Sequence, residues 1–369
     1  MARCLALLGM VATHVLDERT ASGGLTFGQA LAGGRASALF AVLAGVSIAL
    51  VTGRAQPWRG VSRARAAAGL AVRAVLIAGI GLVLAEMKSG IAVILTYYGL
   101  LFLLALPFLG LSARWLAALA GIWVVAAPVF SHWLRERLPE RGFASPSWGQ
   151  LAEDPLGMLS ELTFTGYYPA VPWLAYVLAG MAIGRLDLTS RRAAAALLAV
   201  GAVLAAAATA LSRALTDRPG IGRALLTDPP AGDASTAALL DRISEGLPGT
   251  TPTDGAWEWL LVVAPHTATP FDLAHTIGSA LVVIGLALLV VGAASRVVTR
   301  AIALLFGAGT MTLTLYSLHV VLRSPELLPE ALRDSFRFHA LLVLGIGLVF
   351  VAAGRRGPLE RIVAPRLPS

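Results

Sequence analysis

The chain has 369 residues, of which 57% are hydrophobic and only 14% are charged, and its mean hydropathy is +0.76. Soluble domains carry charge on about a quarter of their residues, so this composition excludes an ordinary soluble protein and predicts a polytopic membrane protein. The formal net charge of +8 could indicate nucleic-acid binding. The basic residues are scattered among short loops between apolar segments, however, so we expect no nucleic-acid partner. The single cysteine, Cys4, excludes an intrachain disulfide and a cysteine-ligated metal cluster.

The apolar segments predict an all-α bundle of about ten transmembrane helices that forms one domain over residues 1–369. Most segments reach the ~20 residues needed to cross about 30 Å of hydrocarbon, although the first is shorter. The segments are 3–16, 34–53, 66–86, 90–110, 113–132, 167–185, 191–212, 271–294, 299–322 and 336–354. Two long loops lie between them, at about 133–166 and 213–270. Loops of this length usually serve a function or are partly disordered.

The charges predict the orientation of the bundle. With a cytoplasmic N-terminus, the cytoplasmic loops are rich in arginine and hold only two acidic residues, Asp187 and Glu360. This distribution follows the positive-inside rule. We therefore expect both termini in the cytoplasm, both long loops on the non-cytoplasmic side, and a multi-pass protein of the cell inner (plasma) membrane. The inverted topology is the alternative.

Three histidines inside or at the edge of apolar segments are the candidates for a functional role. They are His14, His275 and His319, and the predicted topology places all three toward the non-cytoplasmic face. Ionisable groups within a bilayer are costly and usually serve a function. We therefore expect one polar site near that face, with the three imidazoles around a common cavity.

His14 lies at the end of the first segment, three residues before Asp17. Residues three apart share a helical face, so the Asp17 carboxylate could orient the imidazole of His14 as a general base. The alternative is an interfacial histidine that is hydrogen-bonded to a backbone carbonyl.

The eighth segment begins with a helix-start signal, in which Thr269 is the N-cap, Pro270 the first helical residue and Asp272 the returning partner of a capping box. Asp272 and His275 belong to a polar stripe on an otherwise apolar helix, and such a stripe must face the bundle interior or water. We predict a catalytic role for both residues. For Asp272 the alternative is a capping role alone.

The ninth segment carries a second polar stripe, formed by Thr312, Tyr316 and His319. Hydroxyl side chains in membrane helices often only bond to the preceding turn or to a neighbouring helix. That explanation does not account for His319, so we predict catalytic roles for His319 and Tyr316.

Other residues are candidates for binding. Arg35 begins the second segment on the side where arginine is unexpected, and it could hold an anion or a carboxylate; the alternative is that it extends to the membrane surface. Aromatic candidates for the substrate pocket are Tyr97, Tyr98 and Tyr168, although aromatic residues near an interface are often only membrane anchors.

A basic cluster that includes Arg54, Arg63 and Arg73 could bind the phosphates of a nucleotide-like co-substrate. The positive-inside rule accounts for the same residues without any ligand. The spacing of histidines and cysteines fits no zinc site, so we expect no metal.

Several motifs occur in a recognisable order. Arg3 leads into Ala6-Leu7-Leu8-Gly9-Met10 and then His14, and a helix of small residues follows at 34–47. Tyr-Tyr-Gly at 97–99, Gly-Tyr-Tyr-Pro at 166–169 and Thr-Leu-Tyr-Ser-Leu-His at 314–319 come next. In this order the chain resembles bacterial multipass proteins related to heparan-alpha-glucosaminide N-acetyltransferase, a family of transmembrane acyltransferases. The resemblance covers most of the chain apart from the loop at 213–270.

The resemblance implies that cytoplasmic acyl-CoA inserts its thioester into the bundle and that an acceptor is acylated on the far side. The usual Arg-Gly start of the family stands here as Arg3-Cys4. In the heparan enzyme a histidine in the loop after the first core helix is thought to be catalytic. Residues 15–34 contain no histidine here, so that role is not transferred to His14 by position.

Together these features predict a membrane acyltransferase that moves an acyl group, acetyl in the first instance, from acyl-CoA to a hydroxyl or amine of a glycan, glycolipid or envelope acceptor. Membrane lipids surround it, and an oligomer is compatible with the sequence. The alternative interpretation is that the protein is not an enzyme but a proton-coupled transporter or exporter of a small polar or anionic substrate, in which the histidines would relay protons. A non-catalytic assembly protein is a third interpretation, in which the histidines would be dispensable.

Overall fold

The computed structural model describes residues 1–139, 141–142, 145–227, 232–253 and 255–364, and its regular elements are all helical. Parts of both long loops (140, 143–144, 228–231 and 254) lie outside the described residues. The principal helices are α1 (Ala2–Val15), α3 (Arg35–Val51), α4 (Gly60–Ala85), α5 (Leu95–Ala105), α6 (Ala113–Arg135), α9 (Ala170–Gly184), α10 (Arg191–Thr216), α13 (Pro270–Ala293), α15 (Thr312–Leu322) and α17 (Phe336–Ala352).

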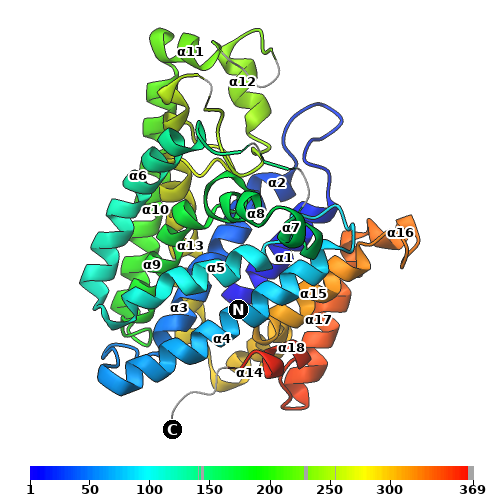
Figure 1. Ribbon diagram of the computed structural model, residues 1–369. Coiled ribbons are helices and arrows are strands. Elements are labelled where there is room, and N and C mark those ends of the chain that lie inside the picture. The colour runs from blue at the N-terminus through cyan, green and yellow to red at the C-terminus, as the bar shows by residue number, and fades with distance from the viewer. Residues whose placement is uncertain (140, 143–144, 228–231, 254, 365–369) are drawn as a thin grey trace.

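Short helices complete the chain at the two ends of the bundle (Figure 1). The end that carries the two long loops holds α2 (Phe27–Ala32), α7 (Trp148–Glu153), α8 (Pro155–Ser160), η2 (Glu161–Thr165), α11 (Pro219–Leu225), α12 (Thr236–Ile243), η3 (Trp257–Leu261) and α16 (Glu330–Arg333). Toward the opposite end lie η1 (Leu106–Gly110), α14 (Arg296–Leu305), η4 (Gly307–Thr310) and α18 (Pro358–Ile362). We call these the loop end and the basic end.

Among the described residues, five helices are long and apolar enough to cross a membrane. They are 27–51, 60–85, 113–135, 191–216 and 270–293. Five further apolar helices are shorter, at 2–15, 95–110, 170–184, 312–322 and 336–352. Each predicted segment therefore contains an apolar helix, but half of these helices fall short of a full span.

The ninth predicted segment, 299–322, is not one helix. It contains the end of α14, the 3₁₀ turn η4 and the buried helix α15. The turn arises because Gly307 and Ala308 lie directly against Gly347 of α17, where a Cβ added to Gly347 would overlap the Ala308 backbone nitrogen. α14 has no buried residue, so the segment is divided between an exposed amphipathic helix and a short internal one.

α9 is the central helix, because nearly all its residues are buried, and α3, α5 and α6 pack around it. α3 and α9 approach most closely at Gly45 and Gly180, where a Cβ added to Gly180 would overlap the Val42 carbonyl oxygen. Small residues allow membrane helices to pack backbone against backbone. This contact fixes α3, and α3 in turn carries residues of both cavities described below.

Gly180→Ala should lower the free energy of unfolding by about 1–3 kcal/mol, because the new methyl group forces α3 and α9 apart. Thermal unfolding in detergent measures the change. Gly79→Ala in α4 is the matched control, since a Cβ added there would meet no atom within 4 Å, and alanine favours a helix over glycine. Equal melting temperatures for the two variants would contradict the assigned contact.

Candidate functional site

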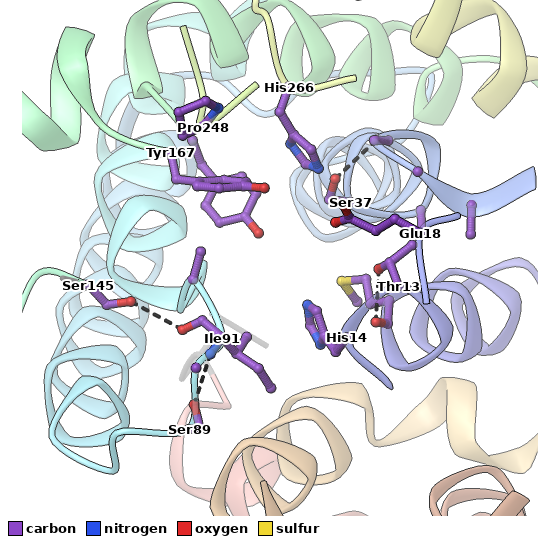
Figure 2. Close-up of a pocket in the computed structure, with 18 of the residues that line it drawn as sticks. Thr13, His14, Glu18, Ser37, Ser89, Ile91, Ser145, Tyr167, Pro248 and His266 are labelled. Carbon is purple, nitrogen blue, oxygen red and sulfur yellow. Dashed lines mark hydrogen bonds between the residues drawn. The ribbon is translucent and has the colours of Figure 1, made fainter. Parts of the chain in front are cut away.

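Two cavities lie at different heights along the same helices. The larger has a volume of about 550 Å³ and opens near the loop end. Its walls come from α1, α2, α3, the end of α4 and several of the connecting loops (Figure 2). The side chains with chemistry to offer are Thr13, His14, Glu18, Gln29, Ser37, Lys88, Ser89, Arg141, Ser145, Tyr167, Tyr168, Glu245 and His266.

His14 and His266 enter the larger cavity from opposite walls, with Tyr167 between them on a third side (Figure 2). His266 lies in the loop before α13 and has a positive φ of 58°. Its ring is parallel to that of Trp173, at 6.4 Å between centroids, and touches Tyr167 at 4.9 Å and Tyr168 at 5.6 Å. One wall of the cavity is therefore aromatic.

The opposite wall is acidic. Glu18 and Glu245 both line the cavity. Partial desolvation, followed by the neighbouring Glu245 carboxyl, raises the pKa of Glu18. Arg19 holds this wall in place, because its guanidinium pairs with Glu245 and, at 3.0 Å, with Asp241. The loop after α1 is thereby tied to α12 above the cavity.

The smaller cavity, of about 260 Å³, lies toward the basic end and is mostly apolar. Two arginines line it, Arg3 at the start of α1 and Arg73 in α4. Arg3 donates to the Ser47 hydroxyl. The Nε of Arg73 is buried and has no hydrogen-bond partner in the described part of the chain. An anionic group in this cavity would find a guanidinium donor available.

Two tyrosines separate the cavities. Tyr98 lines the smaller cavity, and its hydroxyl donates to the backbone oxygen of Ser37, which lines the larger one, at 3.2 Å. Tyr316 also lines the smaller cavity, and its oxygen accepts from the Ile94 amide at 3.3 Å. The two tyrosines are therefore hydrogen-bonded to Ser37 of α3 and to Ile94 just before α5.

His14 is linked to two other histidines from the C-terminal part of the chain. Its Nδ1 lies 3.2 Å from Nε2 of His319, and Nδ1 of His319 lies 3.1 Å from Nδ1 of His339. Nε2 of His339 lies 2.9 Å from the carbonyl oxygen of Arg333. We call His14, His319 and His339 the histidine file. His319 and His339 are each 1% exposed, so the file runs inward from the cavity wall.

The expected pairing of His14 with Asp17 does not form. α1 ends at Val15 and the chain becomes extended at Leu16, so Asp17 leaves the helical face it was predicted to share with His14. The Asp17 side chain is exposed, and its backbone oxygen accepts from the Thr26 hydroxyl at 2.7 Å. His319 takes the position beside the imidazole that was expected for the carboxylate.

His275 and Arg35 lie together but line neither cavity. Nε of Arg35 donates to Nε2 of His275 at 3.0 Å, and Nδ1 of His275 bonds the Thr209 hydroxyl at 2.9 Å. The three imidazoles expected around one cavity are therefore divided, with His14 and His319 in contact and His275 elsewhere.

Asp272 has the geometry of a helix cap. The Thr269 hydroxyl accepts from the Asp272 amide at 3.0 Å, and the Asp272 carboxylate accepts from the Ala268 amide at 3.1 Å. Asp272 is 4% exposed and absent from both cavity walls. Its position favours the capping interpretation over a catalytic one.

The remaining candidates are distributed unevenly. Tyr168 lines the larger cavity, whereas Tyr97 lines neither, its hydroxyl oxygen accepting from the Tyr167 amide at 3.2 Å. Of the basic cluster only Arg73 reaches a cavity. Arg63 is exposed, and Arg54 contributes its backbone oxygen as an acceptor for buried Arg185 at 2.8 Å.

Sequence reasoning missed His266, His339, Glu18 and Arg3 as parts of the site. His339 lies inside the tenth apolar segment, so the criterion that selected the other histidines would have found it. His266 had no such signal, because it belongs to a loop whose path over the cavity is set by tertiary contacts. Within the described residues, no group of three or more His, Cys, Asp or Glu side chains is arranged to hold a metal ion.

The family model for the catalytic region of heparan-alpha-glucosaminide N-acetyltransferase matches residues 1–215. The protein belongs to this family. The matched residues include α1, α3, α4, α5 and α9, and thus much of both cavity walls. Membership in this family implies an acetyltransferase, and the apolar helices fit a membrane protein. The sequence matches no curated protein.

Burial lowers the pKa of His266 from 6.5 to about 4. Between about pH 6.5 and pH 4 the unfolded chain binds a proton at His266 that the folded chain does not bind. The free energy of unfolding therefore decreases as the pH falls through this window. His266→Gln should therefore lose less stability than the unmodified protein on acidification. Thermal unfolding in detergent at pH values spanning the window measures this, and parallel pH dependences would contradict it.

Proposed function

We propose that this protein is a membrane acetyltransferase that takes the acetyl group from acetyl-CoA in the smaller cavity and transfers it to a hydroxyl or amine of a glycan or envelope component in the larger cavity. The observation that carries the proposal is the arrangement of two cavities along α1 and α3, linked through the hydrogen bond from Tyr98 in the smaller cavity to Ser37 in the larger one. Family membership supplies the reaction class. The cavities supply separate places for a donor and an acceptor.

The smaller cavity suits a thioester arm that enters from the basic end. α1 carries Arg3 at one cavity and His14 at the other, and eleven residues of helix separate them by about 16 Å at 1.5 Å per residue. Arg3 and Arg73 offer cationic donors to phosphate or carbonyl oxygens. The apolar walls between them suit the extended arm of the donor.

The larger cavity suits a sugar. The rings of Tyr167, Tyr168 and His266 offer flat apolar faces, on which the C–H face of a pyranose can pack. Across the cavity, Glu18 and Gln29 offer hydrogen-bond groups to hydroxyls, and the two glutamate carboxyls could also receive an ammonium group. Both hydroxyl and amine acceptors fit this lining.

His14 is the general base in this proposal. Its Nε2 accepts the proton of the acceptor as the acceptor oxygen or nitrogen attacks the thioester carbon. The C–S bond then breaks, and the proton passes from His14 to the departing thiolate to give CoA thiol. For a hydroxyl acceptor no net proton is released, whereas an acceptor that begins as an ammonium group releases one.

Tyr316 is placed to stabilise the tetrahedral intermediate. Its oxygen already accepts from the Ile94 amide, so its own proton is available to a developing oxyanion between the two cavities. Tyr98 differs, because its proton is directed to the Ser37 carbonyl oxygen. Of the two tyrosines, Tyr316 is therefore the oxyanion donor in this proposal.

The proposed orientation places the basic end in the cytoplasm, where the donor is made. The arginine-rich loops follow the positive-inside rule in this orientation, and both termini are cytoplasmic. The loop end, with its cover of short helices, then faces the non-cytoplasmic side of the inner membrane and receives the acceptor there.

His14→Gln should reduce kcat for acetyl transfer by about 10²–10⁴-fold, the usual contribution of a general base, and should leave acetyl-CoA binding intact. Transfer of radiolabelled acetyl to a panel of amino sugars and neutral glycans measures the rate. His275→Gln is the control, because that imidazole lies outside both cavities. Undiminished transfer by His14→Gln would exclude His14 as the base.

Arg73→Gln should raise the KM for acetyl-CoA by about tenfold or more, since a charge-assisted hydrogen bond contributes about 1.5–3 kcal/mol. Arg65→Gln is the matched control, because Arg65 is on the same helix and is exposed outside the cavity. Calorimetric titration with acetyl-CoA gives the affinities directly. Equal affinities for the two variants would place the donor elsewhere.

A further inference from the structure

The histidine file is anchored on a group that can only accept a hydrogen bond. The carbonyl oxygen of Arg333 lies 2.9 Å from Nε2 of His339, so this nitrogen must carry a proton. A neutral imidazole has one N–H and one bare nitrogen. Nδ1 of neutral His339 is therefore the bare nitrogen, and it can only accept.

The same reasoning passes along the file. Nδ1 of His319 faces the bare Nδ1 of His339 at 3.1 Å, so Nδ1 of His319 is the donor and its Nε2 is bare. Nδ1 of His14 faces that bare Nε2 at 3.2 Å, so Nδ1 of His14 is the donor. One backbone carbonyl thus determines the tautomers of three side chains.

The remaining nitrogen of His14 is therefore a bare acceptor. His14 lines the larger cavity, and its Nε2 makes no hydrogen bond to the described residues. It is also absent from the buried unpartnered atoms of the described chain, so it is open to the cavity. A lone pair on this atom is what a general base needs.

We propose that His319 and His339 are positioning residues that lock the tautomer of His14, with the Arg333 carbonyl as the reference acceptor, so that Nε2 of His14 faces the acceptor without a proton. This inference rests on the proposed function for its catalytic meaning. The tautomers themselves follow from the hydrogen bonds and can be tested without any substrate.

The lock matters because an unconstrained neutral histidine side chain carries its N–H more often on Nε2 than on Nδ1. Without the file, the commoner tautomer of His14 would present a donor to the cavity and could not accept a proton. Serine proteases show the cost of the wrong tautomer, where replacing the orienting aspartate by asparagine lowers kcat about 10⁴-fold. Here two imidazoles and a carbonyl would do what a carboxylate does there, without a buried charge.

The reference carbonyl is held in position by a second donor. Nη1 of Arg323, just after α15, donates to the same Arg333 oxygen at 3.2 Å, and Arg323 also pairs with Asp334. His319 and His339 lie beyond residues 1–215, which the family model matches. The lock is therefore an inference about this chain and not one carried over from the family.

Nitrogen-15 NMR of histidine-labelled protein in lipid bilayers tests the lock directly, because protonated and bare ring nitrogens have well-separated shifts. His14 and His319 should both be Nδ1–H tautomers, whereas His339 should be Nε2–H. Single His→Gln variants assign the signals. An Nε2–H tautomer at His14 in the unmodified protein would overturn the proposal whatever the enzyme's activity.

His339→Leu and His339→Asn form the decisive pair of variants. Leucine removes the acceptor for His319, so His319 and then His14 should revert toward Nε2–H, and kcat should fall by about 10²-fold or more, on the scale of wrong-tautomer variants. Asparagine keeps an acceptor oxygen near the Nδ1 position, so it should retain the tautomer of His14 and most of the activity. If the leucine variant does not fold, the asparagine variant and the unmodified spectra still decide.

The controls separate this inference from the proposed function. Arg337→Ala removes an exposed side chain from the helix that carries His339, so it should leave both the spectra and kcat near those of the unmodified protein. If the spectra show the predicted tautomers but the protein transfers acetyl to no acceptor, the result supports the lock and counts against the proposed acetyltransferase function. Loss of activity in His339→Leu with an unchanged His14 tautomer would reduce His339 to a packing role and overturn the lock.

Discussion

Every polar group inside an apolar bundle must find its partner within the protein, and this constraint organises the structure. Arg185, 3% exposed, shows how it is met, because its guanidinium donates to the backbone oxygens of Ala49, Thr52, Arg54 and Leu109. Such a residue joins helices through its two terminal nitrogens, although its Nε has no partner among the described residues. A polar group with spare hydrogen-bond capacity is of most interest where it lines a cavity.

Three groups with spare hydrogen-bond capacity lie at the two cavities. They are Nε2 of His14, Nε of Arg73 and the hydroxyl proton of Tyr316. His275 and Asp272 looked equally promising as residues, but they line neither cavity and are hydrogen-bonded to Arg35, Thr209 and Ala268. The difference between a structural and a functional polar residue thus depends on its partners, and sequence does not show these.

Local features of the fold were predictable because they depend on neighbouring residues. Apolar length gave the positions of the helices, and Thr269, Pro270 and Asp272 start α13 as their capping pattern predicts. The division of the ninth segment was not predictable, since it depends on Gly347 lying against Gly307, forty residues away. The partner of His14 was not predictable for the same reason, because His319 is 305 residues away in the sequence and no local pattern connects the two residues.

The position of α1 has a consequence for how the protein is made. This helix packs against α3, but also against η4, α15 and α17. α1 is synthesised before η4, α15 and α17, so it cannot make these contacts until the C-terminal part of the chain has been synthesised and inserted. Long-range contacts of this kind slow assembly. A nascent chain therefore cannot complete the histidine file until synthesis is nearly finished, because His339 is the last of its three members along the sequence.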